Sequence, residues 1–245
     1  MGTKERRDRE RQELRQAILS ASRDIAAREG WQAVSMRKVA ERIEYSPPTI
    51  YEHFASKEAL LIELMREGFR LLMERVQVGS SAAAPEARIM AVALAYWDFA
   101  WDYPELYQVM HGLGGVPFCF DAGIEADESA PNLPDSEQFS PEAKAVFQFT
   151  MDALKDLVGG GEQDCEERAA SVHILWATLH GLVALTMAGR IDGGRTQAAG
   201  LVERAVRGFL IAQRVTRSQE SGARIQESGD DRALADFSRS THSDS

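Results

Sequence analysis

Cysteine is scarce in this sequence, with two residues among 245, and these two, Cys119 and Cys165, lie far apart. Their spacing fits neither a metal site nor a redox motif, so it indicates free buried thiols in a reducing compartment. The first residues, MGTKERRDRERQELRQ, are charged and precede no apolar run, so we expect no secretory signal. These absences predict a cytoplasmic protein without a metal site.

The motifs of several enzyme classes are also missing. The sequence contains no G-x-S-x-G, no P-loop, no H-E-x-x-H and no G-x-G-x-x-G of the dinucleotide type. The segment H111-G-L-G-G115 has the composition of an oxyanion loop, but nothing supplies a nucleophile for it. We therefore expect no enzymatic activity and no cofactor.

Positive charge is in short supply, since 28 Lys and Arg stand against 38 Asp and Glu and give a formal net charge of −10. Taken over the whole chain, this argues against a nucleic-acid partner. The distribution is uneven, because residues 1–60 hold 12 basic and 10 acidic residues, whereas residues 61–245 hold 16 and 28. Only the first part of the chain is expected to approach a polyanion.

Helical periodicity dominates the sequence, and the alternation typical of strands is nearly absent. The apolar residues of the first segment recur at i, i+4, i+7 and i+11, at Leu14, Ile18, Ala21 and Ile25. Gly30 then stands in the position of a C-cap, which predicts a helix over about residues 9–29. Ser35 and Ser56 are N-caps for a short second helix and for a long helix over about residues 57–78. The pattern predicts an all-α fold.

Two adjacent prolines begin another short helix. Ser46 is a natural N-cap, and Pro47 and Pro48 fit the first helical positions, where the backbone N–H has no intrahelical partner. The helix continues from Thr49 to about Phe54 and follows the second helix after a tight turn. Two short helices joined by a turn are typical of a helix-turn-helix.

The segment V39-A-E-R-I-E-Y-S-P-P-T-I-Y-E-H-F-A-S-K-E-A-L60 resembles the DNA-binding segment of the tetracycline-repressor (TetR) family. The resemblance covers about residues 10–65. It implies a three-helix DNA-binding head followed by a larger helical body that binds a ligand and dimerises. The segment W176-A-T-L-H-G181 is similar to a family subgroup marked by Trp, His and Gly (WHG) on one helix of the body.

The resemblance places DNA contacts at three positions. These are the start of the second helix, the short helix that begins at Pro47 and corresponds to the family's recognition helix, and the start of the helix over about residues 57–78. Hydroxyl, imidazole and ammonium groups at these positions can donate to phosphate. Tyr51 could instead pack against the start of the helix over about residues 57–78. Glu52 could be a solvated charge or could accept a hydrogen bond from a cytosine amino group. The expected DNA-binding residues are Ser35, Arg37, Lys38, Ser46, Pro48, Thr49, Tyr51, Glu52, His53 and Lys57.

Two residues depart from the family pattern. Glu44 stands where the family usually has glycine, so either it adopts a left-handed backbone at a cost of about 1 kcal/mol or the turn differs. Pro47 replaces a residue that is often basic or polar, which moves base contacts toward Pro48, Thr49, Glu52 and Tyr51. The arginines before residue 12 form either a basic arm that reaches a minor groove or a salt-bridged helix start.

The body contains a dense aromatic segment. Residues 89–101 carry one charge and form a helix that is too short to span a membrane, and their aromatics could line a pocket. His173 and His180 are seven residues apart, about 10 Å along a helix, which is too far to share a metal. For each histidine a core hydrogen-bonding role is favoured over contact with a ligand. The expected ligand-binding residues are Trp97, Trp101, Tyr107, Phe147, Met151, His173, Trp176 and His180.

The remaining segments set the domain organisation. Residues 112–138 break the helical pattern and are either disordered or functional, and their apolar piece V116-P-F-C-F120 could cover the mouth of a pocket. Two long helices over about residues 164–188 and 196–214 match the family's four-helix dimer interface. The tail from residue 216 is predicted to be disordered. We therefore expect a DNA-binding domain over residues 1–58, a ligand-binding and dimerisation domain over 59–215, and a disordered tail over 216–245.

These features predict a dimeric transcriptional regulator, most simply a repressor that binds a palindromic operator in double-stranded DNA and is released by a small apolar or aromatic effector. The alternative is a helical small-molecule-binding protein with little affinity for DNA, because Glu44, Pro47 and the acidic body all disfavour binding.

Overall fold

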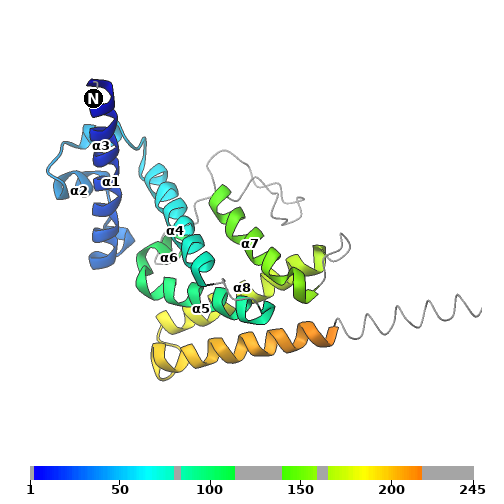
Figure 1. Cartoon of the computed structure of the whole chain (residues 1–245). Coiled ribbons are helices and arrows are strands. Elements are labelled where there is room, and N and C mark those ends of the chain that lie inside the picture. Colours follow the sequence, from blue (N-terminus) through cyan, green and yellow to red (C-terminus); the bar gives the residue numbers. More distant parts are fainter. Residues whose placement is uncertain (1–2, 80–83, 114–139, 159–164, 217–245) are drawn as a thin grey trace, which may run out of the picture. The chain divides into compact units, whose positions relative to one another are not determined.

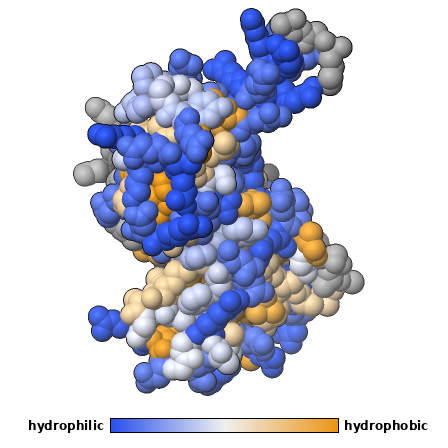
Figure 2. Space-filling view, turned by 90° about the vertical axis from the view of Figure 1, so that its left-hand side faces the viewer, coloured by the Kyte–Doolittle hydropathy of each residue, from blue (hydrophilic) through white to orange (hydrophobic). Residues whose placement is uncertain are grey.

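The computed structural model describes residues 3–79, 84–113, 140–158 and 165–216 (Figure 1). All regular structure in these ranges is helical, and none of their residues is in a strand. The all-α fold predicted from the sequence is therefore confirmed. One face of the chain, seen in Figure 2, is covered mostly by hydrophilic residues, with hydrophobic residues in separate patches.

The first helices form the head of the chain: α1 (Thr3–Glu29), the 3-10 helix η1 (Trp31–Ala33), α2 (Met36–Arg42) and α3 (Pro47–Tyr51). Their shared core holds fully buried apolar side chains from all three α-helices, namely Ile18, Ile25, Val39, Ala40 and Ile50. Because α3 has only five residues, packing against α1 and α2 must hold it in place.

Local signals set the boundaries of these helices. Ser35 caps α2, since its side-chain oxygen accepts from the backbone N–H of Lys38 at 3.2 Å. Gly30 has φ of 81°, which suits the glycine that ends α1. The start of α1 was predicted six residues too late, because the charged residues near Thr3 carry no apolar stripe. An i,i+4 ion pair between Arg6 and Glu10 lies in this first part.

Three further helices follow the head along the chain: α4 (Lys57–Gly79), α5 (Pro85–Asp102) and α6 (Pro104–Met110). Ser56 caps α4 as predicted, with its Oγ 3.2 Å from the Ala59 backbone N–H. Gly68 allows α4 and α6 to approach closely, because a Cβ at this position would lie 2.5 Å from the Sδ of Met110.

An ion-pair network joins the head to α4 and α6. Arg23 of α1 donates to one carboxylate oxygen of Glu105 from Nε and Nη2, at 3.1 and 3.0 Å, and to Glu67 at 2.9 Å. The buried indole N–H of Trp31 donates to the backbone carbonyl of Glu105 at 3.0 Å. Glu105 is only 8% exposed, so its pairing with Arg23 compensates for the burial of its charge.

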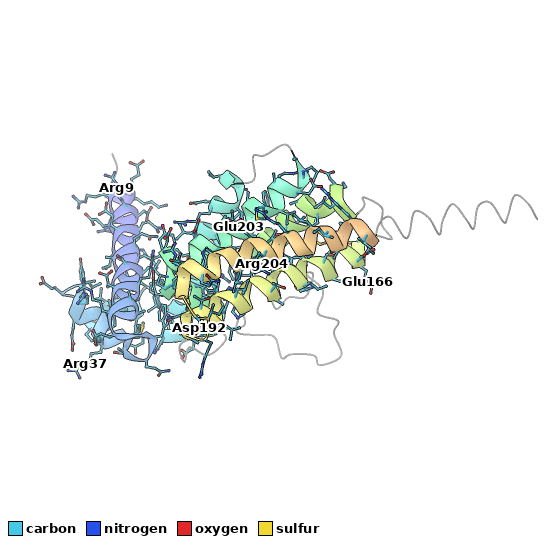
Figure 3. The ribbon with its side chains drawn as sticks, turned by 90° about the horizontal axis from the view of Figure 1, so that it is seen from below. Arg9, Arg37, Glu166, Asp192, Glu203 and Arg204 are labelled. Atoms are coloured by element: carbon cyan, nitrogen blue, oxygen red, sulfur yellow. The ribbon has the colours of Figure 1, made fainter. Side chains whose placement is uncertain are left out.

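The chain divides into two compact units, one of residues 1–82 with 91–150 and the other of residues 83–90 with 151–245. Helix α7 (Pro141–Val158) contributes residues to both units. The second unit contains α8 (Cys165–Met187) and a helix over residues 194–216, which lie side by side in Figures 1 and 3. Ser171 of α8 donates to the side-chain oxygen of Gln213 at 3.2 Å across this pair. The predicted boundary at residue 58 stays a prediction.

Several sequence predictions fall outside the described residues, among them most of the 112–138 segment, the tail after residue 216 and Cys119. Cys165 was expected to be buried, and this was wrong. Its thiol is exposed because it is the first residue of α8, outside the apolar stripe of that helix.

Candidate nucleic-acid interface and ligand residues

The recognition helix α3 begins as the sequence predicts. Ser46 is the N-cap in an extended backbone conformation, and Pro47 and Pro48 occupy the first two helical positions. The Ser46 hydroxyl makes no cap bond to the backbone but lies 2.8 Å from the Thr49 hydroxyl. Ile50 is fully buried, so it anchors the helix from behind. The predicted contact residues Pro48, Tyr51 and Glu52 are exposed, as is Pro47.

Tyr51 and Tyr45 are prominent on this surface. Tyr51 is 53% exposed and Tyr45 is 50% exposed. Core packing therefore does not account for Tyr51, and its ring is available to a partner. Tyr45 was not among the sequence-predicted contacts, although its position directly before Ser46 could have suggested one.

The turn between α2 and α3 contains the only residue other than glycine with positive φ in the described part of the chain. Glu44 has φ of 61°, so the first of the two alternatives for this position is the one observed. The turn closes through a hydrogen bond of 3.0 Å from the Tyr45 backbone N–H to the Ala40 carbonyl. A residue with a Cβ in this region costs about 1 kcal/mol relative to glycine.

The three predicted phosphate-binding cations each have an intramolecular partner. Arg37, whose side chain is 83% exposed, pairs with Glu41 at 2.9 Å, and Lys38 pairs with Glu29. Figure 3 shows Arg37 projecting away from the helices of the head. Lys57 lies at the start of α4, where its ammonium donates to the Trp31 carbonyl at 3.4 Å. These surface contacts are weak, so a phosphate can replace them.

Arg42 and Arg15 are two cations that the sequence reasoning missed. Arg42 ends α2, is exposed and has no ion pair or hydrogen bond within the described residues, so it is available to phosphate. Arg15 lies behind α3, where it donates to the His53 carbonyl at 3.3 Å, pairs with Glu63 at 3.1 Å and covers the Phe54 ring at 4.4 Å. Arg15 therefore positions the end of the recognition helix.

His53 lies in a groove between α1 and the recognition helix. The groove has a volume of about 580 Å³ and is lined by Glu10, Arg11, Leu14, Tyr45, Glu52 and His53. Burial lowers the pKa of His53 below its usual 6.5, and Arg11 and Arg15 lower it further, whereas Glu52 acts in the opposite direction. The imidazole is therefore neutral in the free protein at neutral pH.

The predicted ligand residues divide between the two units. In the first unit Trp97 is buried and Trp101 is half-buried, and their ring centroids are 5.5 Å apart. Tyr107 is buried, with its hydroxyl accepting from Tyr96 at 3.2 Å. Burial raises the pKa of both phenols, so they remain neutral donors. Phe147 is half-buried on α7.

The other four predicted ligand residues belong to the second unit. Met151 is buried, and Trp176 is half-buried on α8. His180 is also half-buried, and burial lowers its pKa. His173 is exposed, so the core role expected for it was wrong. It lies next to Ile174, which is also exposed in the single chain.

Two family models match the chain. Residues 18–64 match a model described as bacterial regulatory proteins, tetR family. Residues 89–209 match a model described as tetracyclin repressor-like, C-terminal domain. The first match contains α2, α3 and the start of α4, and the second contains all eight predicted ligand residues.

Curated relatives align with part of the chain. The uncharacterized HTH-type transcriptional regulator YobS of Bacillus subtilis is 28% identical over 91 residues, which are 37% of this chain and 48% of that protein. The HTH-type transcriptional repressor KstR of Mycolicibacterium smegmatis is 39% identical over 72 residues, 29% of this chain and 33% of the repressor. The chain thus spans about half the length of these relatives, or less.

Solved structures share the fold over a larger part of the chain. The fatty acid degradation regulator FadR of Bacillus halodurans has a TM-score of 0.57 at 16% identity. The match covers 80% of this chain and 94% of the FadR chain. A TetR variant from Acinetobacter baumannii, solved in complex with minocycline, has a TM-score of 0.55 at 15% identity and covers 80% and 93%. At this level of identity the likeness establishes the fold alone.

Proposed function

Because this chain belongs to the TetR family of bacterial regulatory proteins, we propose that it is a repressor that binds a palindromic operator as a homodimer and is released by a small apolar or aromatic effector. The regulator assignment itself follows from the family, whose members matched here are transcriptional regulators and not enzymes. The repressor role takes its support from KstR, which is named a repressor. A regulator of this kind acts on chromosomal DNA and thus in the cytoplasm.

The observation that carries the proposal is the exposed recognition helix. Helix α3 presents Pro47, Pro48 and Tyr51 to solvent while Ile50 holds it against the core. The cations Arg37, Lys38 and Arg42 of α2 lie beside it and supply phosphate contacts. A recognition helix with flanking cations suits insertion into a major groove.

Dimerisation through the second unit is supported by an apolar surface on its last two helices. By length and composition alone, α8 could cross a membrane, yet only 33% of its apolar window is buried within the chain. Exposed stripes include Ile174 and Leu185 on α8 and Ile211 and Val215 on the helix over residues 194–216, with exposed fractions of 58, 51, 62 and 50%. A second copy packed on these helices would cover this surface.

Glycines within the same stripes support close helix packing. On α8, Gly181 lies between Ile174 and Leu185 at a spacing that puts all three on one helix face. On the helix over residues 194–216, Gly200 and Gly208 lie on the same face as Ile211 and Val215. A Cβ added at any of these three glycines would have no atom within 4 Å. The space that each glycine leaves therefore opens outward, where a helix of a second copy can approach.

The effector is proposed to contact the aromatic residues predicted from the sequence. Within the first unit the adjacent rings of Trp97 and Trp101 offer an apolar surface, and the buried Tyr107 lies on α6, which packs on α4. The minocycline complex of a structural neighbour supports a small-molecule effector. Ligand and operator must favour different states of the dimer, and a coupling of about 1–3 kcal/mol is typical.

Salt-dependent DNA binding distinguishes this proposal from the alternative of a small-molecule-binding protein with little DNA affinity. Duplexes selected by the protein from a random pool are titrated by fluorescence anisotropy at several salt concentrations. We expect affinity to fall steeply with salt and Lys57→Ala to reduce the slope by about one unit for every duplex, because one phosphate contact is lost. An affinity that does not respond to salt, or that is no better than for an unselected duplex, contradicts the proposal.

Tryptophan fluorescence tests the effector site. Compounds that release DNA should change the emission of the wild type, and Trp97→Ala should keep operator binding while losing release. Trp31 is buried in the head and serves as the internal background. Release of DNA without any change in emission would place the effector elsewhere.

A further inference from the structure

The outward surface of the recognition helix is apolar. We call the exposed side chains of Pro47, Pro48 and Tyr51 the proline–tyrosine face. Of the other residues of α3, Ile50 is fully buried and Thr49 is half-buried. The first turn of the helix therefore presents two pyrrolidine rings to a partner, followed by one phenol ring.

These rings limit what the helix can read. Guanine, cytosine and adenine are recognised in the major groove through hydrogen bonds to their edges, which require side-chain donors or acceptors. Proline has neither on its side chain and also lacks the backbone N–H. Thymine alone presents a C5 methyl group in that groove, and apolar side chains recognise it by contact.

The residues with hydrogen-bonding groups lie at the edges of this face. The Thr49 hydroxyl is 2.8 Å from the Ser46 hydroxyl, so the two share a hydrogen bond on one side. Glu52 follows the helix as its C-cap, and the Tyr51 hydroxyl lies at the far end of its ring. In a helix-turn-helix the first residues of the recognition helix contact base edges, and here those residues are the two prolines.

We propose that the proline–tyrosine face reads thymine methyl groups in each operator half-site. This proposal rests on the proposed DNA-binding function. It adds that thymine is the base that the recognition helix contacts in each half-site. Arg37, Lys38 and Arg42 then fix the position of the helix on the phosphates, and the methyl contacts select the sequence.

Replacing thymine by deoxyuracil tests this directly, because it removes the methyl group and leaves every hydrogen bond and charge in place. Duplexes selected from a random pool should carry adjacent A·T pairs in each half-site. Deoxyuracil at a contacted thymine should weaken binding about three- to fivefold per methyl group. Deoxyuracil outside the half-sites should leave the affinity unchanged.

A proline variant assigns the effect to this face. In Pro48→Ala the loss caused by deoxyuracil should shrink below about twofold, since the methyl group then has a smaller apolar partner. Pro141→Ala is the matched control, because Pro141 is an exposed proline at the first position of α7. It should retain the full deoxyuracil effect, and circular dichroism should show that both variants are folded.

The possible outcomes distinguish failure of the DNA-binding function from failure of the methyl readout. If no duplex is enriched and none binds, the DNA-binding function fails. If selected duplexes bind tightly but deoxyuracil is equivalent to thymine throughout the half-sites, the function stands and the methyl readout is wrong. Half-sites without thymine would contradict the methyl readout in the same way.

Discussion

At the scale of single residues, Glu44 carries backbone strain in the turn that aims the recognition helix. Its φ of 61° lies in the left-handed region, which glycine adopts without a steric cost. Glu44→Gly should therefore stabilise the protein by about 1 kcal/mol, or less where glycine adds freedom to the unfolded chain. Urea unfolding followed by circular dichroism measures this.

Glu44→Ala is the control, because it removes the same charge but keeps a Cβ. It should be no more stable than the wild type. Equal stabilisation by glycine and alanine would show that the glutamate charge, and not the backbone conformation, limits the stability of this turn.

His53 makes the stability of the head depend on pH. The pKa of His53 in the folded protein lies below 6.5, first because of burial and then because of Arg11 and Arg15. The folded state thus binds a proton more weakly than the unfolded state, so His53 lowers stability as the pH falls below about 6.5. The urea midpoint of the wild type should fall relative to that of His53→Gln between about pH 7.5 and about pH 5.5.

His180 titrates in the same direction but is present in both proteins, so the comparison isolates His53. DNA binding should respond with the opposite sign, because a nearby phosphate favours the imidazolium form. Parallel midpoints for the two proteins across this range would rule out a proton-linked role for His53.

At the scale of elements, the exposed stripe of the last helix tests the dimer. Ile211 is 62% exposed on the helix over residues 194–216. Ile211→Glu should dissociate the dimer while the single chain stays folded, because it places a charge within the proposed apolar interface. Light scattering after size-exclusion chromatography reports the mass.

Val78→Glu is the matched control, since Val78 is 80% exposed on α4 in the first unit. The Val78→Glu variant should keep the mass of a dimer, as the wild type does. If Ile211→Glu also eluted as a dimer, the interface would lie on another surface.

Helix boundaries were predictable where their signals are local. Ser35 and Ser56 cap helices through bonds to residues three positions away, and Pro47 begins α3 because it requires only its own φ. Of the α3 residues expected to contact DNA, Pro48 and Tyr51 are exposed, whereas Thr49 is half-buried. A charged helix start such as that of α1 has no apolar stripe, so its first turns were missed.

Contacts between distant residues could not be predicted in this way. The indole of Trp31 bonds to the Glu105 carbonyl 74 positions later, and Arg15 reaches the His53 carbonyl 38 positions away. No periodicity connects such pairs, because each depends on how whole helices pack. The pairing of Lys38 with Glu29 was missed for the same reason, since it spans the turn around η1.

At the scale of the whole molecule, the acidic balance of the chain requires that DNA meet only the head. Residues 61–245 carry the acidic excess, with 16 basic and 28 acidic residues, so their approach to phosphate is unfavourable. A dimer joined through the second unit would present two heads. Each head then occupies one half-site, and the two sites must lie on the same side of the duplex.

Operator spacing therefore tests the central claim, that the chain binds DNA as a dimer with two heads. A duplex selected by the protein is compared with one that has five base pairs inserted between its half-sites, which rotates them apart by about half a turn. The account predicts that anisotropy titrations show a loss of about a hundredfold for the inserted duplex, because only one head can bind. Equal affinity for the two duplexes would contradict it.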